Sequence, residues 1–253
     1  MNDRSAPFAV VVPMFNEEAG ARRCIDEISR ALRDSPLSPR LIVVNDGSSD
    51  RTGEILAAAE NEINALTVVS HPRNLGYGQA LQTGGRTALA LGCDFVIFMD
   101  SDLTNDPGFI RILAEKMNED CDLVKASRYI PGGGVENIPP WRYWISRAGN
   151  ALARFLYGLP VHDCTNGFRA IRTELLKQMH IRERGFPAIM EELYWAKTLR
   201  ARVCEVPYIL TSRAETLRPS SFEYRPGVFY SYLKYPLMTF LHIHPAPIKQ
   251  DNS

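Results

Sequence analysis

Two aspartates separated by one residue could bind a divalent metal ion. Asp100 and Asp102 end the apolar run at residues 94–99, which is typical of a buried strand. Side chains alternate along a strand, so we expect both carboxylates on one face and Ser101 on the other. Proteins bind Mg²⁺ or Mn²⁺ through one or two carboxylates, and water and substrate phosphates supply the remaining ligands. The pair therefore predicts a metal site that serves a diphosphate-bearing substrate.

Three more apolar runs end in polar residues that could bind a ligand. These polar stretches are residues 13–17, 45–50 and 71–74. In an open α/β sheet, ligands bind beyond the carboxyl ends of the strands. Gly76 and Gly78 follow the third stretch and would allow close approach of the backbone to a ligand. Each stretch alone is also consistent with a turn or a helix cap, so it is their clustering that favours a shared site.

Arginines in the second half of the chain are candidates for binding phosphate. They are Arg128, Arg142, Arg147 and Arg169. A planar guanidinium group can donate two hydrogen bonds to one phosphate. Surface arginines are usually only solvated, so their place near an acidic centre is what makes these four candidates.

The elements that must position these residues alternate between strands and helices. Strands are expected at residues 8–14, 40–44, 65–70, 94–99 and 122–127. This alternation predicts an α/β fold with a single mostly parallel sheet flanked by helices. A glycine loop at residues 132–134, an aromatic helix from about Trp141 and a loop at residues 158–167 follow. We expect one domain, residues 1–225, and a C-terminal amphipathic helix and tail, residues 226–253.

Composition and charge exclude several classes of protein. Apolar residues make up 45% of the 253 residues and charged residues 23%, which is enough to bury a core. Lysine plus arginine and aspartate plus glutamate number 29 each, so no net positive field would hold nucleic acid. Residues 13–18 contain no glycine, which argues against the phosphate loops of dehydrogenases and P-loop kinases.

Cysteine usage and hydropathy indicate a cytoplasmic protein. The five cysteines are odd in number, scattered and not spaced as in a zinc site, which fits a reducing cytosol best. Residues 1–7 lack the features of a secretory signal. Residues 228–243 are apolar but include Lys234, Pro236 and His242, so we expect this segment to lie on a membrane without crossing it. A homo-oligomer or a membrane-protein partner is possible.

Several sequence motifs together resemble a known family. They are VPMFNE at 12–17, VVNDGSSD at 43–50, NLGYG at 74–78, MDSDL at 99–103, SRY at 127–129, GGG at 132–134, TNGFR at 165–169 and EVP at 205–207, followed by Arg213. With them the chain resembles family 2 inverting glycosyltransferases of GT-A fold, in the dolichyl-phosphate mannosyltransferase-like branch. The chain departs from the family at Asn45, where the family has aspartate, and at Thr104, where many members have glutamine.

The resemblance implies a role for each candidate residue. Residues that would bind the nucleotide-diphosphate sugar are Pro13, Phe15, Glu17, Asp46, Arg73, Gly76 and Arg213. Asp100 and Asp102 would bind Mg²⁺ or Mn²⁺. Arg128, Arg142 and Arg169 would bind the phosphate of a polyprenyl phosphate acceptor, and Asp102 and Arg128 would act in catalysis.

The implied reaction moves a hexosyl group from a donor of the GDP-mannose or UDP-glucose type to polyprenyl phosphate. The second pKa of a phosphate monoester is about 6, so the acceptor is largely ionised at neutral pH and needs no strong general base. Two alternatives remain open. A soluble family 2 enzyme acting on a hydroxyl acceptor would use Glu192, in a helix expected at residues 189–200, as a catalytic base, unless Glu192 only lies on a solvated turn. A noncatalytic nucleotide-sugar-binding module would not need the two metal carboxylates.

Overall fold

The computed structural model describes residues 7–33, 39–136, 138–210 and 226–243. Arg213, which the resemblance assigns to the donor diphosphate, lies outside these residues.

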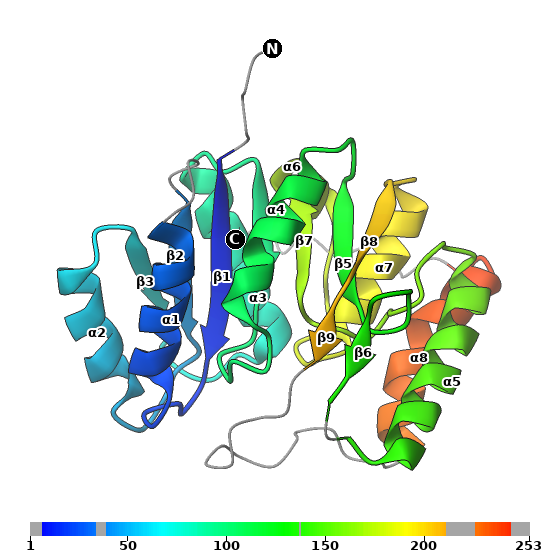
Figure 1. Ribbon diagram of the computed structural model, residues 1–253, viewed down its shortest axis with the longest axis horizontal. Coiled ribbons are helices and arrows are strands. Elements are labelled where there is room, and N and C mark those ends of the chain that lie inside the picture. Colours follow the sequence, from blue (N-terminus) through cyan, green and yellow to red (C-terminus); the bar gives the residue numbers. More distant parts are fainter. Residues whose placement is uncertain (1–6, 34–38, 137, 211–225, 244–253) are drawn as a thin grey trace, which may run out of the picture.

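A seven-stranded sheet forms the centre of the molecule, in the order β3-β2-β1-β4-β7-β5-β8 (Figure 1). Its strands are β1 (Phe8–Met14), β2 (Arg40–Asn45), β3 (Leu66–Ser70), β4 (Phe95–Phe98), β5 (Leu123–Ser127), β7 (Arg169–Arg172) and β8 (Val203–Pro207). All are parallel except β7, which pairs antiparallel with β4 and β5. The expected mostly parallel sheet is confirmed, and each of the five expected strands ends within one residue of its prediction. A small second sheet pairs β6 (Gly134–Val135) with β9 (Ile209–Leu210).

Helices cover both faces of the large sheet (Figure 1). They are α1 (Ala21–Arg33), α2 (Thr52–Glu62), α3 (Tyr77–Ala90), the 3₁₀ turn η1 (Pro107–Phe109), α4 (Ile110–Met117), α5 (Pro140–Tyr157), α6 (Thr173–Gln178), α7 (Ala188–Thr198) and α8 (Pro226–Phe240). Because side chains alternate along β1, Val10 and Val12 pack with α1 and α4, whereas Ala9 and Val11 pack with α3. The sheet therefore has one apolar core on each face.

A third core lies beyond the β8 edge of the sheet, where α5 and α8 lie side by side (Figure 1). Tyr157 of α5, Leu193 of α7 and Tyr235 of α8 are buried there together. The C-terminal helix thus packs against the rest of the fold. The division of the chain at residue 225 stays a prediction.

Cys121 and Cys204 form a disulfide that joins the start of β5 to β8. Cys24, Cys93 and Cys164 are free and buried. The spacing of the cysteines did not indicate this pair, because the two are separated by 83 residues and meet only when β5 and β8 pair. The bridge also departs from the expectation of a reducing cytosol, where disulfides are rare.

Candidate active site

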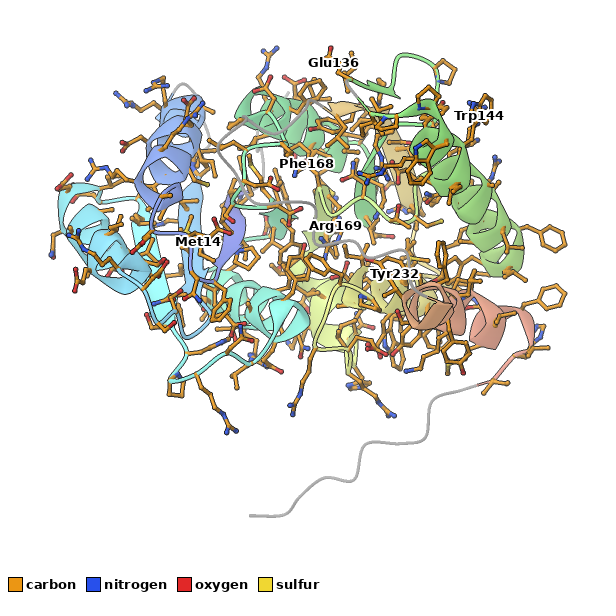
Figure 2. All side chains as sticks on the ribbon, turned by 90° about the horizontal axis from the view of Figure 1, so that it is seen from below. Met14, Glu136, Trp144, Phe168, Arg169 and Tyr232 are labelled. Carbon is orange, nitrogen blue, oxygen red and sulfur yellow. A yellow bond between two sulfur atoms is a disulfide. The ribbon has the colours of Figure 1, made fainter. Side chains whose placement is uncertain are left out.

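The parallel strands β1, β2, β3 and β4 end at one edge of the sheet, and Figure 2 looks onto this edge. Met14, the last residue of β1, lies on one side of it, Phe168 and Arg169 lie near the middle, and Tyr232 of α8 lies on the other side. The polar strand ends predicted from the sequence are therefore brought together.

The loops after β1 and β2 are tied to each other by hydrogen bonds. The backbone amide of Asn16 donates to Oγ of Ser48 at 3.0 Å, and the backbone amide of Ser49 donates to Oδ1 of Asn16 at 2.8 Å. Asn16 has a left-handed backbone, with φ of 54°, which asparagine tolerates better than most residues. These bonds fix the loop carrying Phe15 and Glu17, which we expect to contact the nucleoside.

Asp46 anchors the loop that follows β3. Its Oδ1 accepts from the backbone amide of Leu75 at 2.8 Å, and its Oδ2 accepts from that of Gly76 at 2.9 Å. Nδ1 of His71 lies 2.7 Å from Oδ1. The side chain of Asp46 is almost wholly buried. It therefore holds the loop after β3 in position beside the candidate nucleotide site.

Gly47 allows the loop after β3 to lie directly against the loop after β2. Its φ is +67°, and a Cβ there would lie 2.2 Å from the backbone carbon of Arg73. A side chain at this position would push the loop carrying Arg73 away from β2. The glycine in the VVNDGSSD motif is therefore needed for the contact between the loops after β2 and β3.

Asp100 and Asp102 lie in the turn after β4, which ends at Phe98. We expected strand alternation to place both carboxylates on one face. Alternation does not apply to them, because β4 ends before Asp100. Asp100 Oδ1 accepts a hydrogen bond from the hydroxyl of Tyr77 at 3.0 Å. Asp102 Oδ1 accepts from the amide and the hydroxyl of Thr104, at 3.0 and 2.7 Å. Each carboxylate is oriented by a hydroxyl group.

The aspartates and Glu17 create a negative region at this edge of the sheet. Burial raises the pKa of the neighbouring Cys24 thiol, and the charges of Asp102, Glu17 and Asp100 raise it further. Within the described part of the chain, no three or more histidine, cysteine or acidic side chains form a group that could hold a metal ion. Two carboxylates nevertheless fit Mg²⁺ or Mn²⁺, which take their other ligands from water and phosphate oxygens.

Arg169 and Glu192, predicted to bind the acceptor and to act as a base, are bonded to each other. The guanidinium Nε and Nη2 of Arg169 donate to the two carboxylate oxygens of Glu192, and both residues are buried. The arginine also lies over the ring of Phe98, 4.6 Å from its centroid. The helix turn that carries Glu192 is therefore not solvated, and most residues of α7 are buried.

Arg128 is held by a buried aspartate. Its Nε and Nη2 donate to Asp163 at 2.7 and 2.8 Å, and Nη2 also donates to Thr165 at 3.0 Å. Burial alone would raise the pKa of Asp163, but the charge and hydrogen bonds of Arg128 hold it below its usual value. Arg128 is thus locked at the end of β5, and Asp163, which sequence reasoning did not single out, is the residue that locks it.

The sequence reasoning also did not identify Lys125 as part of the site. Its ammonium group is buried and donates to the carbonyl oxygens of Asn166 at 2.6 Å and Cys164 at 3.2 Å. Burial, followed by the charge of Arg169, lowers the pKa of Lys125 to about 8. A lysine inside the apolar strand LVKAS was the available signal, because buried lysines are rare unless they have a partner.

Arg142 lies on the exposed part of α5, with its guanidinium 5.2 Å from the ring centroid of Trp141. The same helix is fastened to the Arg128 region by two contacts. The hydroxyl of Tyr129 donates to Ser146 at 2.8 Å, and the side chain of Asn150 accepts from the amide of Cys164 at 2.7 Å. Arg128 and Arg142, two of the three arginines predicted to bind the acceptor phosphate, therefore belong to connected elements.

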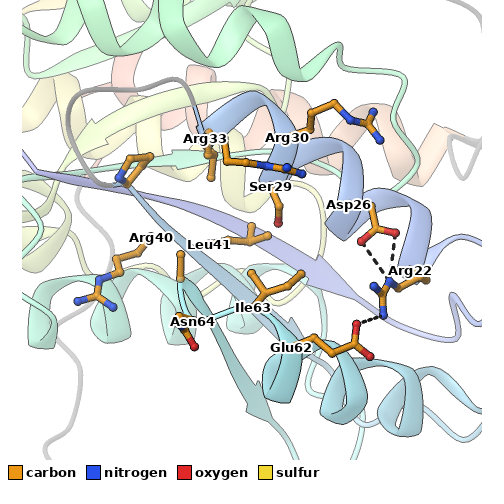
Figure 3. Close-up of a pocket in the computed structure, with 13 residues that line it drawn as sticks. Arg22, Asp26, Ser29, Arg30, Arg33, Arg40, Leu41, Glu62, Ile63 and Asn64 are labelled. Atoms are coloured by element: carbon orange, nitrogen blue, oxygen red, sulfur yellow. Dashed lines mark hydrogen bonds and ion pairs between the residues drawn. The ribbon is translucent and has the colours of Figure 1, made fainter.

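A pocket of about 810 Å³ lies elsewhere, between α1, the start of β2 and the residues before β3 (Figure 3). It is lined by Arg22, Ser29 and Arg40 among others. Arg40 is the first residue of β2, whereas the candidate site lies beyond its last residue. This pocket contains none of the predicted site residues.

The chain belongs to glycosyl transferase family 2, whose family model matches residues 9–179. It is 30% identical over 210 residues to the polyprenol monophosphomannose synthase of Mycolicibacterium smegmatis, covering 81% of this chain and 77% of that one. It is also 30% identical over 206 residues to the undecaprenyl-phosphate mannosyltransferase of Micrococcus luteus, covering 80% and 83%.

The structure resembles glucosyl-3-phosphoglycerate synthase from Mycobacterium tuberculosis, solved with Mn²⁺, uridine diphosphate and glucosyl-3-phosphoglycerate. The TM-score is 0.66 at 26% identity, over 95% of this chain and 82% of that one. The GT-A fold expected from the sequence motifs is confirmed.

Proposed function

We propose that the protein transfers a hexosyl group, with inversion, from a nucleotide-diphosphate sugar to the phosphate of a polyprenyl phosphate. The observation that carries this proposal is the attachment of α5, an exposed aromatic and basic helix, to the loops that hold Arg128. Two relatives at 30% identity are named for mannosyl transfer of this kind. GDP-mannose and UDP-glucose are the donors to compare.

Asp100 and Asp102 would hold Mg²⁺ or Mn²⁺ against the donor diphosphate, and such an ion stabilises the charge on the leaving group. The nucleoside would lie against the loops that carry Phe15, Glu17 and Asp46. An ionised acceptor phosphate oxygen forms the new bond to the anomeric carbon as the bond to the diphosphate breaks. The bonding electrons leave with the nucleoside diphosphate, so no proton has to be removed from the acceptor.

The acceptor phosphate would be bound by Arg128 and Arg142. Nε and Nη2 of Arg128 face Asp163, so we assign Nη1 to the phosphate. Arg169 is assigned a different role from the one implied by the resemblance, because its guanidinium is fully buried and paired with Glu192.

The lipid chain would follow the outer surface of α5 and α8, which we call the α5–α8 face. Its exposed apolar residues include Trp141, Trp144, Ile145, Phe155, Tyr230 and Phe240. Trp144 projects outward from α5 (Figure 2). The two helices contain three arginines and one lysine but no aspartate or glutamate. Aromatic residues with basic neighbours are typical of helices that lie at an anionic membrane surface.

We therefore place the protein peripherally at a membrane surface, with the α5–α8 face against the bilayer. The described helices include none with the length and hydropathy to span a bilayer.

The test uses polyprenyl phosphate in vesicles of phosphatidylcholine and phosphatidylglycerol. Arg142→Glu should raise the KM for the lipid phosphate by about tenfold or more, since it removes a charge-assisted hydrogen bond and adds repulsion. Metal-dependent donor hydrolysis should remain near wild type. Arg23→Glu, on the exposed side of α1, is the matched control and should change neither quantity.

Vesicle sedimentation tests the α5–α8 face separately. Trp144→Ser should weaken binding to the vesicles, whereas Leu91→Ser, an equally drastic change at an exposed residue after α3, should not. Transfer to a soluble alcohol without any transfer to polyprenyl phosphate would overturn the proposal.

A soluble acceptor is the alternative that one observation favours, namely the structural likeness to a synthase solved with glucosyl-3-phosphoglycerate. A hydroxyl acceptor needs a base, and the sequence offered Glu192 for it. Both oxygens of Glu192 accept hydrogen bonds from the guanidinium group of Arg169, so both are already engaged within the protein. This arrangement favours the phosphate acceptor.

A further inference from the structure

Tyr77 makes a contact with Asp100 that the proposed reaction does not yet use. Tyr77 is the first residue of α3, and its hydroxyl donates to Asp100 Oδ1 at 3.0 Å. It belongs to the NLGYG motif, in which sequence reasoning considered only the glycines as carriers of function.

The ring of Tyr77 is held in place by a neighbouring aromatic ring. The ring of Phe186 stacks on it, with centroids 4.6 Å apart and an angle of 29° between the planes. Phe186 follows a short segment, residues 183–185, that packs against the start of α3. The hydroxyl is therefore presented to Asp100 by a side chain that has little freedom to rotate away.

The start of α3 is clamped to this segment through its backbone. The amide of Gly78 donates to the carbonyl oxygen of Arg184 at 2.7 Å. A Cβ at Gly76 would lie 2.5 Å from that oxygen, and a Cβ at Gly78 would lie 2.1 Å from the carbonyl oxygen of Glu183. Only glycine permits these contacts, which places Tyr77 at a fixed depth beside the turn that carries Asp100.

The segment is fixed in turn by α8. Oε1 of Glu183 accepts from Nζ of Lys234 at 2.7 Å and from the hydroxyl of Tyr235 at 3.0 Å. The amides of Arg182 and Glu183 donate to the buried carboxylate of Glu191 at 2.7 and 2.8 Å. The support behind Tyr77 therefore extends into the third core.

Asp100 is confined on its other side by the turn at Gly167. A Cβ at Gly167 would lie 3.2 Å from both Asp100 Oδ2 and the Tyr77 hydroxyl. The carbonyl oxygen of Gly167 accepts from Nη1 of Arg169 at 2.6 Å. The buried pair of Arg169 and Glu192 thus supports the turn against which the carboxylate packs.

The Tyr77 hydroxyl donates its hydrogen bond to the carboxylate of Asp100 and adds no negative charge of its own beside a cation.

We propose that Tyr77 is a positioning residue for the divalent cation, holding the carboxylate of Asp100 in the orientation that receives Mg²⁺ or Mn²⁺. The inference rests on the metal site of the proposed function. Thr104 holds Asp102 in the corresponding way, so the two metal carboxylates are each oriented by one hydroxyl. Groups that orient metal ligands typically change metal affinity by about 10- to 100-fold when they are removed.

The test is Tyr77→Phe, which deletes the hydroxyl and keeps the ring that stacks on Phe186. The dissociation constant of Mn²⁺ is measured by electron paramagnetic resonance, with GDP or UDP present at saturation and no sugar or acceptor. We expect this constant to rise about tenfold, with the thermal midpoint close to that of wild type. Tyr157→Phe is the matched control, because its buried hydroxyl donates to the carbonyl oxygen of Met190 in the third core.

Two outcomes overturn the inference, and they are distinguishable. If wild type binds Mn²⁺ more tightly than Asp102→Asn but Tyr77→Phe binds it as wild type does, the positioning role is wrong and the metal site stands. If wild type binds Mn²⁺ no more tightly than Asp102→Asn, the metal site itself is wrong.

Discussion

At the scale of single residues, the acidic groups of the candidate site are of two kinds. Some are proposed to contact ligands, and the others hold the surrounding protein in place. Asp100 and Asp102 are half-buried in the turn after β4, whereas Asp46, Asp163 and Glu192 are buried and accept hydrogen bonds from protein donors on both carboxylate oxygens. Buried charges are retained in proteins when they are paired and hydrogen-bonded. The acidic residues of the site therefore differ in role although they are chemically alike.

Asp102→Asn should abolish metal-dependent turnover and leave the fold intact. The change removes an anionic metal ligand but almost no volume, and the remaining oxygen can still accept from Thr104. Turnover is measured against Mn²⁺ concentration, and folding by thermal denaturation. Asp94→Asn, an exposed residue immediately before the start of β4, is the control. Turnover near the wild-type level in saturating Mn²⁺ would remove Asp102 from the metal site.

At the scale of elements, β7 is the strand that departs from the parallel pattern and brings the TNGFR motif to the middle of the sheet. It runs antiparallel between β4 and β5, so its first residue, Arg169, lies beside the ends of its neighbours. Glu192 reaches Arg169 from α7. The pair joins strand to helix directly behind the turn at Gly167.

Glu192→Ala should lower the free energy of unfolding by about 3–5 kcal/mol, because removing one partner leaves a buried charge unpaired. Arg169→Ala should cost a similar amount. The double variant should lose less than the sum of the two, because neither charge is then left without its partner. Urea denaturation of the three variants measures the coupling. Additive losses, or a Glu192→Ala variant that is fully stable but inactive, would instead favour a direct catalytic role for Glu192.

At the scale of the whole molecule, one disulfide closes a long loop of the chain. The disulfide between Cys121 and Cys204 ties the adjacent strands β5 and β8, and between these cysteines the chain includes α5, β7 and α7. Most of the residues proposed to bind the acceptor belong to this closed loop. A bridge of this kind stabilises a fold mainly by restricting its unfolded chain.

Replacing both Cys121 and Cys204 by serine should lower the free energy of unfolding by about 4 kcal/mol, as expected for a loop of this length. The denatured wild-type protein should titrate three thiols without reductant and all five cysteines after reduction. Cys93→Ser, which removes a free thiol, should titrate two thiols and provides the control. Five thiols in the unreduced protein would contradict the bridge.

The sequence by itself determined the strands, the polar residues at their ends and the family motifs. These features are local: hydrophobic period and chain direction are enough to place Asp46 and Asp100 at the same edge of a parallel sheet. The turn after β4 escaped this reasoning, because alternation describes side chains only while the strand continues.

Only the tertiary structure decided which charged groups are partners. Arg169 meets Glu192 and Tyr77 meets Asp100 across 23 residues each, and Cys121 meets Cys204 across 83. Such pairs depend on the packing of strands and helices that are distant in the chain, and no local pattern records this packing. The sequence therefore identified Arg169 and Glu192 as chemically capable groups. Their burial and their pairing with each other indicate that they support the site.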